Sequence, residues 1–354
     1  MLLAVLAGAS REATTAATAS APRTLVTAHG RIYAFAQDGD WIGWVAGDAR
    51  VRVRRLSTRR TWVVGKVGRP ERASTAVIAL ARSRALWAWD SSGNNVEETI
   101  VSGAPGTKAA GVDLLLGDLR GTGGGARFSG VAGDGATLAY GWVLEQCVNR
   151  PLKICDVPWT DPLVVTGGGV VLARAGQHPL QRPPVIPGVP PPAMFAIGEG
   201  RVAVVPARSP TPPGEWVPRV AEDGPVDVYN LAGNRLMSAR FDGLVRGVAL
   251  AGHTLALLQE QPNGSKVIRR FDARNGAYVA VSGRIALGAT DLSASTGGIV
   301  FRVGLAIYVL HGRTPRFVVR ATGTPVGLSI EGRRVAWAEN VHGHGRILAV
   351  TVPR

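Results

Sequence analysis

Histidines and carboxylates are the first residues to test for chemistry, because they supply most catalytic acids, bases and metal ligands. His342 and His344 alternate in the segment HGHG, with Glu339 nearby, but the sequence names no third ligand. The carboxylates are dispersed along the chain, as at Glu97, Glu98, Asp223, Asp227 and Asp291. The sequence therefore predicts no metal site, no catalytic residues and no cofactor.

Motifs of nucleotide-binding proteins and hydrolases give the same result. The Gly-rich segment GDLRGTGGGAR (117–127) lacks the Lys-Ser/Thr pair of a P-loop, and no helical pattern follows it. No G-x-S-x-G nucleophile elbow is present. An enzyme is thus less expected than a binding protein, although two carboxylates that meet in a folded channel could still hydrolyse glycosides.

The two cysteines, Cys147 and Cys155, flank the segment VNRPLKI. A turn between them would bring the pair to disulfide distance, and such bonds persist outside the cytoplasm. The C-x-x-C spacing of redox proteins is absent, and two thiols without a nearby histidine do not complete a zinc site. We therefore expect a disulfide that holds a long loop.

Short β-strands are the elements that must position these residues. The chain is rich in glycine (46), proline (23) and β-branched residues, and no window of 11 or more residues carries a helical stripe. The phrase DGDWIGWV (38–45) recurs in seven versions at a mean spacing of about 49 residues, which is typical of propeller blades. We align the versions on these residues: Trp44, Trp89, Tyr140, Val204, Leu257, Arg302 and Trp337.

Each repeat is interpreted as four strands, A to D. In the first, strands A and B meet at Asp38-Gly39, a dipeptide typical of two-residue hairpins. Ile42 and Trp44 alternate along strand B and should pack between blades. The sequence predicts an all-β, seven-bladed propeller of four-stranded antiparallel blades, with six or eight blades left open because 145–195 is hard to divide.

Closure of the ring is predicted from the two ends of the chain. The last repeat has only three strands, and a spare strand over 24–30 precedes the first. That spare strand should complete the last blade and remove its free edge. Residues 23–354 would then form a single propeller domain, preceded by a signal remnant or disordered tail over 1–22.

The repeats resemble the WD40-like repeats of bacterial TolB-type β-propellers. The matching residues are Asp38, Gly39, Ile42 and Trp44, then Glu331, Gly332, Val335 and Trp337, then Phe271, Asp272 and Gly276. The resemblance covers residues 24–353 and implies the fold alone, because such repeats occur in envelope scaffolds and in enzymes.

The N-terminal segment indicates export. An apolar run over residues 2–9 is too short to span a bilayer and precedes small-residue cleavage sites, as in a secretory signal. We expect a periplasmic, cell-wall or extracellular protein, with the disordered tail of an intracellular protein as the alternative. No other stretch is apolar for long enough to be a membrane anchor.

The formal net charge of +15 is carried almost wholly by arginine. The arginines are scattered, often at alternate strand positions such as Arg50, Arg52 and Arg54, where they should face solvent. This pattern predicts weak, salt-sensitive attraction to anionic polymers, without specific nucleic-acid binding.

Long loops point to a binding face. The B–C and D–A links are longer than the A–B and C–D turns, so nearly every insertion should lie on one face of the propeller. The candidate partner-binding residues there are Glu145, Asn149, Arg150, His178, Trp216, Arg219 and Asp223. The strand A segments are small and apolar, which predicts a packed channel without a catalytic pocket.

The leading hypothesis is an exported, non-enzymatic, monomeric scaffold that binds a protein or glycan at the cell envelope. The alternatives are a carbohydrate lyase or hydrolase with a site in the central channel, and an intracellular interaction scaffold. Perturbed carboxylates in a channel pocket would favour the enzyme. An aromatic–arginine patch on the long-loop face would favour the envelope scaffold.

Overall fold

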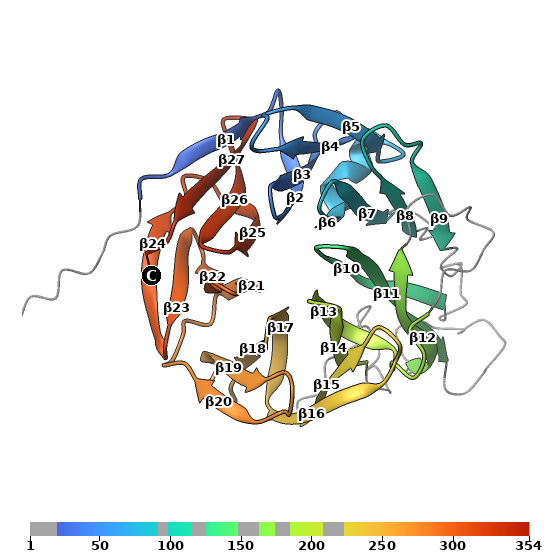
Figure 1. Cartoon of the computed structure of the whole chain (residues 1–354), viewed down its shortest axis with the longest axis vertical. Coiled ribbons are helices and arrows are strands. Elements are labelled where there is room, and N and C mark those ends of the chain that lie inside the picture. The colour runs from blue at the N-terminus through green and yellow to red at the C-terminus, as the bar shows by residue number, and fades with distance from the viewer. Residues whose placement is uncertain are drawn as a thin grey trace, which may run out of the picture.

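The computed structural model of the chain is a closed ring of seven antiparallel β-sheets around a central channel (Figure 1). It describes residues 20–90, 98–114, 125–147, 163–173, 185–207 and 223–353. Six of the sheets have four strands, and one has three within the described residues. The predicted all-β, seven-bladed propeller is confirmed.

The first three blades follow chain order from the channel outwards. Blade 1 comprises β2 (Ile32–Asp38), β3 (Trp41–Ala46), β4 (Arg50–Arg55) and β5 (Thr61–Lys66). Blade 2 comprises β6 (Val77–Ala81), β7 (Arg84–Asp90), β8 (Glu98–Gly103) and β9 (Ala110–Leu114). Blade 3 comprises β10 (Gly125–Asp134), β11 (Thr137–Cys147) and β12 (Leu163–Ala173), and Val185 forms a single antiparallel bridge to Val171 of β12.

Blades 4 to 6 have the same order. Blade 4 comprises β13 (Pro192–Gly198), β14 (Arg201–Pro206), β15 (Asp223–Asn230) and β16 (Arg235–Asp242). Blade 5 comprises β17 (Leu244–Ala251), β18 (Thr254–Glu260), β19 (Lys266–Asp272) and β20 (Tyr278–Val281). Blade 6 comprises β21 (Ala289–Ser295), β22 (Gly298–Val303), β23 (Ala306–His311) and β24 (Thr314–Arg320).

The seventh blade joins the two ends of the chain. Its strands are β25 (Pro325–Glu331), β26 (Arg334–Val341) and β27 (His344–Thr351), and β1 (Arg23–Thr27) adds to the outer edge of β27 (Figure 1). The pairing is antiparallel, and Val26 of β1 is buried against blade 1. The predicted closure by an N-terminal strand is therefore confirmed, and it covers the edge that β27 would otherwise expose.

The core lies between blades. Each of seven apolar clusters among the described residues joins two neighbouring sheets; Ile42 and Trp44, for example, pack with Ala336 and Ala338 of blade 7. The fourth residue of every strand B is almost fully buried: Trp44, Trp87, Tyr140, Val204, Leu257, Phe301 and Trp337.

The sequence alignment was wrong at two of these anchors. Trp87, not Trp89, is the fourth residue of β7, and Phe301, not Arg302, is the fourth residue of β22. A one-residue slip along a strand moves a side chain to the other face, so Arg302 does not share the buried position of Phe301. The single helical element of the described residues is a 3-10 helix, Pro70–Thr75, between β5 and β6.

Candidate functional site

The predicted loop-face site lies largely outside the described residues. Asn149, Arg150, Cys155, His178, Trp216 and Arg219 fall in the segments that the structure does not describe, so neither their grouping nor the Cys147–Cys155 disulfide is tested. Glu145 and Cys147 lie near the end of β11, opposite Val165 and Leu163 of β12. Asp223 begins β15 in blade 4, and its carboxylate accepts a hydrogen bond of 3.2 Å from the Gly243 N–H.

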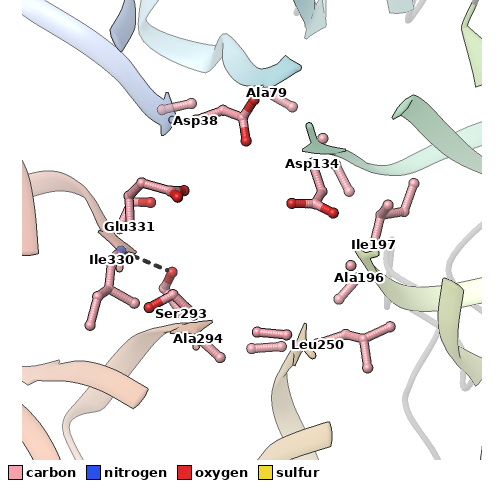
Figure 2. Close-up of a pocket in the computed structure, with 18 of the residues that line it drawn as sticks. Asp38, Ala79, Asp134, Ala196, Ile197, Leu250, Ser293, Ala294, Ile330 and Glu331 are labelled. Carbon is pink, nitrogen blue, oxygen red and sulfur yellow. Dashed lines mark hydrogen bonds between the residues drawn. The ribbon is translucent and has the colours of Figure 1, made fainter. Parts of the chain in front are cut away.

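A pocket of about 430 Å³ occupies the central channel instead (Figure 2). Its wall comes from the innermost strand of every blade and includes Phe35, Phe195 and Leu292. Four carboxylates line it: Asp38, Asp134, Glu199 and Glu331. Figure 2 shows the carboxylates of Asp38, Asp134 and Glu331 pointing into the opening from three sides. Among the described residues that line the pocket there is no arginine, lysine or histidine.

The hairpins between strands A and B place these carboxylates. Asp38, Asp134 and Glu331 are the last residues of β2, β10 and β25, and each precedes a turn glycine. Since strand A is the innermost strand, its last residue stands at the channel mouth. Glu199 lies one position later, within its turn, at a φ of +49°. The site therefore sits on the face of the A–B turns, opposite the long links.

The carboxylates also hold neighbouring turns together. Asp38 accepts hydrogen bonds from the backbone N–H of Arg82 in blade 2 and, at 3.1 Å, from that of Gly135 in blade 3. Asp134 accepts one of 2.6 Å from the Glu199 N–H of blade 4. Each acid thus satisfies a turn donor of another blade and is fixed in its orientation toward the channel.

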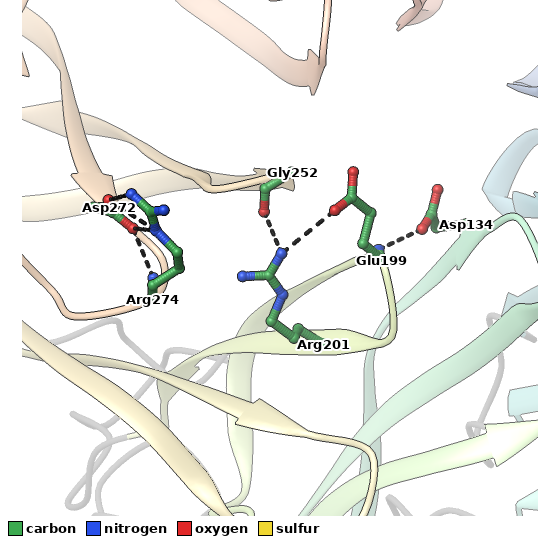
Figure 3. Close-up of polar contacts among 6 residues, drawn as sticks. All are labelled: Asp134, Glu199, Arg201, Gly252, Asp272 and Arg274. Carbon is green, nitrogen blue, oxygen red and sulfur yellow. Dashed lines mark hydrogen bonds and ion pairs between the residues drawn. The ribbon is translucent and has the colours of Figure 1, made fainter.

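Arginines make the complementary contacts around the pocket. Arg201 donates from its guanidinium to the Gly252 carbonyl oxygen of blade 5 at 2.6 Å and lies 3.5 Å from the carboxylate of Glu199 (Figure 3). Arg84 donates to the Ala136 carbonyl oxygen of blade 3 in the same way. Arg334 donates to Gln37 Oε1 at 3.0 Å and to the Gly39 carbonyl oxygen of blade 1. These cations brace the turns outside the pocket and leave its lining acidic.

Burial and mutual repulsion raise two pKa values in the pocket. Burial raises the pKa of Asp134, and the charges of Asp38 and Glu199 add to the effect. Burial likewise raises the pKa of Glu331, helped by the charges of Asp38 and Asp134, although a hydrogen bond from Gly39 opposes it. Burial and neighbouring negative charges both disfavour the ionised carboxylates. No positive side chain among the described lining residues offsets them, so a bound cation would stabilise their ionised forms.

The prediction of a small, apolar channel is wrong at the mouth. Apolar residues line part of the wall, but four acids gather at its end, where the strands A terminate. The signal was present in the sequence as the acid–glycine pairs Asp38-Gly39, Asp134-Gly135, Glu199-Gly200 and Glu331-Gly332. Each pair specifies a turn locally, and the position of strand A at the centre of the ring brings the acids together.

The described residues hold neither a metal-binding cluster nor a membrane-spanning helix. No group of three or more His, Cys, Asp or Glu side chains there could hold a metal ion. Within the same residues no helix has the length and apolar character needed to cross a membrane.

No protein-family model and no curated protein matches the sequence. Among solved structures, the WD40 β-propeller domain of Doa1 is similar with a TM-score of 0.48 and 10% identity, over 93% of this chain and 96% of that one. BamB from Moraxella catarrhalis gives a TM-score of 0.41 and 11% identity, over 91% and 85%. The computationally designed Ika8 protein gives 0.44 and 13%, over 92% and 98%. These likenesses concern the fold alone.

Proposed function

We propose that this protein is a non-enzymatic binding scaffold whose channel mouth receives a basic side chain of a partner protein. The observation that carries the proposal is the pocket lining: four carboxylates and no described base, in a chain of net charge +15. Phe35, Phe195 and Leu292 line the same pocket as the acids, so the aliphatic stem of a lysine or arginine can contact apolar side chains while its charge meets the carboxylates.

The bonding of the acids favours binding over catalysis. Both carboxylate oxygens of Asp38 accept hydrogen bonds from backbone N–H groups of other blades, so the orientation of this carboxylate is fixed. A fixed array of charges needs no reorganisation when a cation arrives, which strengthens attraction in a partly dehydrated pocket.

The test uses hexalysine as the probe and isothermal titration calorimetry as the measurement. We expect wild-type protein to bind it, and the double variant Asp134→Asn, Glu331→Gln to bind at least about tenfold more weakly. The amide side chains keep an acceptor oxygen for the turn N–H groups, so the fold should persist. The control Glu71→Gln, Asp242→Asn removes two exposed charges elsewhere. Equal affinities for the two double variants would refute the proposal.

Hydrolysis is the second candidate function, and the raised pKa values of Asp134 and Glu331 favour it. A carboxylic acid whose pKa is raised by its surroundings can act as the proton donor to a glycosidic oxygen, with a second carboxylate to assist. Reducing-sugar release from a panel of polysaccharides tests it. Activity that Asp134→Asn abolishes would establish the enzyme, whereas no release from any substrate would exclude glycoside hydrolysis on that panel.

We also propose that the scaffold acts outside the cytoplasm, as a monomer at the cell envelope. The apolar run over residues 2–9 and the small-residue sites behind it support export. Cell fractionation with N-terminal sequencing of the mature protein tests this. A processed, extracytoplasmic protein is expected, and an intact N-terminus in the cytosolic fraction would contradict it.

The long-loop face remains a second proposed contact surface. Glu145 and Asp223 lie toward the same end of the propeller, where the links 148–162 and 208–222 join strands B and C. Asn149, Arg150, His178, Trp216 and Arg219 would extend this surface toward a protein or glycan partner. Deletion of 208–222 should weaken partner binding while the hexalysine affinity of the channel is unchanged.

A further inference from the structure

Two tryptophans of blade 1 form an aromatic pair on the same face as the channel mouth. Trp41 is the first residue of β3, directly after the A–B turn, and Trp62 is the second residue of β5, directly after the C–D turn. Their ring centroids lie 5.5 Å apart at an interplanar angle of 39°. Both side chains are only half-buried, so part of each indole faces solvent.

Two arginines extend the pair into a stack. The guanidinium of Arg55 lies 6.0 Å from the centroid of the Trp41 ring, and that of Arg60 lies 5.2 Å from the centroid of the Trp62 ring. A guanidinium that stacks by its face keeps its N–H donors directed outward in the ring plane, ready for a planar oxyanion. The stack thus offers donors in a fixed orientation.

Asp40 holds the stack in place and engages only one of the two arginines. Its carboxylate accepts from Arg55 Nε at 3.1 Å and from the Ser57 N–H at 3.0 Å, which ties the A–B turn to the C–D turn. Burial opposes ionisation of Asp40, but these hydrogen bonds outweigh it and its pKa lies below the usual value. None of the ion pairs among the described residues involves Arg60, which is exposed.

The surface around the stack is polar. Thr58 and Thr61 are exposed and carry hydroxyl groups that can donate to and accept from a sugar, whereas the exposed Ser57 hydroxyl already donates to Asp40. A protein-docking site of this kind would have a broad apolar surround, whereas here the exposed neighbours of the half-buried indoles include Thr58, Arg60 and Thr61.

We propose that this stack, made of Trp41, Trp62, Arg55 and Arg60, binds a uronate-containing polysaccharide. The sugar carboxylate pairs with the guanidinium of Arg60, the C–H groups of the sugar ring contact the exposed part of the indoles, and the sugar hydroxyls meet Thr58 and Thr61. The inference is independent of the channel mouth, whose acids would bind the opposite charge.

The experiment measures binding of hexagalacturonate by isothermal titration calorimetry. Wild-type protein should bind it and should bind its neutral methyl ester at least about tenfold more weakly, because the carboxylate supplies the charge-assisted bonds. Arg60→Lys keeps the charge but loses the planar fork, and should lower the affinity about fivefold. The double variant Arg316→Ala, Phe317→Ala removes an exposed arginine and an exposed aromatic ring from β24, and should bind as wild type does.

Three outcomes would overturn the inference. Absence of hexagalacturonate binding removes it outright. Equal binding by wild type and Arg60→Lys reduces the effect to general charge. Tighter binding of hexaglutamate or of oligodeoxythymidine assigns the stack to an acidic protein segment or to nucleic acid. The Asp134→Asn, Glu331→Gln variant should bind hexagalacturonate normally, so failure here is distinguishable from failure of the channel-mouth proposal.

Discussion

At the residue scale, a few buried polar groups carry charge inside a largely apolar ring. Glu339 of β26 is fully buried and accepts hydrogen bonds from Arg346 Nε at 2.6 Å, from the Thr322 N–H at 2.9 Å and from Trp337 Nε1 at 3.2 Å. The ion pair with Arg346 and the bonds to the link before β25 fix the blade that closes the ring. A buried charge with this many partners is costly to disturb on one side only.

We expect Glu339→Gln to lower the free energy of unfolding by about 3 kcal/mol, because a neutral amide replaces the fully buried carboxylate that accepts from Arg346, Thr322 and Trp337. Urea denaturation measures the change. Asp48→Asn is the matched control, since Asp48 pairs with Arg52 at 2.6 Å while remaining 45% exposed. That substitution should cost less than about 1 kcal/mol, and equal losses would contradict the argument.

Removal of charge from the channel mouth should stabilise the fold, whereas removal of the Glu339 charge should destabilise it. Because the pKa values of Asp134 and Glu331 are raised in the folded state, their protonated forms favour folding. That contribution is complete below the unfolded-state pKa of about 4, and it is lost as the pH rises through the raised values. Asp134→Asn, Glu331→Gln should therefore be more stable than wild type at pH 7 and equally stable near pH 3. Thermal melts measure the midpoint of both proteins from pH 3 to pH 7. A constant difference between the two midpoints over this range would contradict the prediction.

The same titration should control cation binding. As the pH falls through the raised pKa values, Asp134 and Glu331 take up protons before an ordinary carboxylate would, and the pocket loses negative charge. Hexalysine affinity should therefore drop as the pH is lowered from 7, and the Asp134→Asn, Glu331→Gln variant should lack this part of the pH dependence. A pH-independent affinity would contradict the assignment of these acids to the site.

At the scale of the element, the A–B hairpin has two structural roles, and different residues of the hairpin carry them. It reverses the chain through a glycine of positive φ, and it presses the end of strand A against the next blade. Gly135 has a φ of +53° with no atom near its missing side chain. Gly133 has an ordinary φ, but a Cβ there would lie 2.1 Å from the Leu80 carbonyl oxygen of blade 2.

The two glycines give a matched pair of substitutions. Gly135→Ala should cost about 1 kcal/mol, the strain of a left-handed alanine. Gly133→Ala should cost about 2–3 kcal/mol, because overpacking must move a backbone carbonyl of the neighbouring blade. Chemical denaturation of both variants measures the order. A larger loss of stability in Gly135→Ala than in Gly133→Ala would contradict this order. It would mean that turn strain costs more than the close approach of the blades.

At the scale of the whole molecule, closure by β1 determines whether the ring has a free edge. β1 pairs with β27 from Arg23↔Ala349 to Thr27↔Arg346. We expect a chain that begins at Gly30 to unfold at a lower urea concentration and to aggregate, because the outer edge of β27 is unpaired. A chain that begins at Arg23 is the control. Light scattering and the urea midpoint compare them, and identical behaviour would show that three strands suffice for the last blade.

Much of this architecture could be predicted because it depends on neighbours in the chain. Asp38-Gly39 specifies a hairpin locally, and alternation along β3 specifies that Ile42 and Trp44 face the same way. The three-stranded last repeat and the spare first strand specified the closure. The register failed where the repeat is degenerate, as at Trp89 and Arg302, since only cross-strand pairing distinguishes neighbouring apolar positions.

The sequence by itself determined the strands, the turns and the order of the blades, because hairpin chemistry and period-two patterning act over a few residues. Only the tertiary structure brought Asp38, Asp134, Glu199 and Glu331 around one pocket. Their meeting depends on closing the ring, which fixes the radius at which the innermost strands end. Burial and repulsion then arise among groups from different blades, and no local pattern records them.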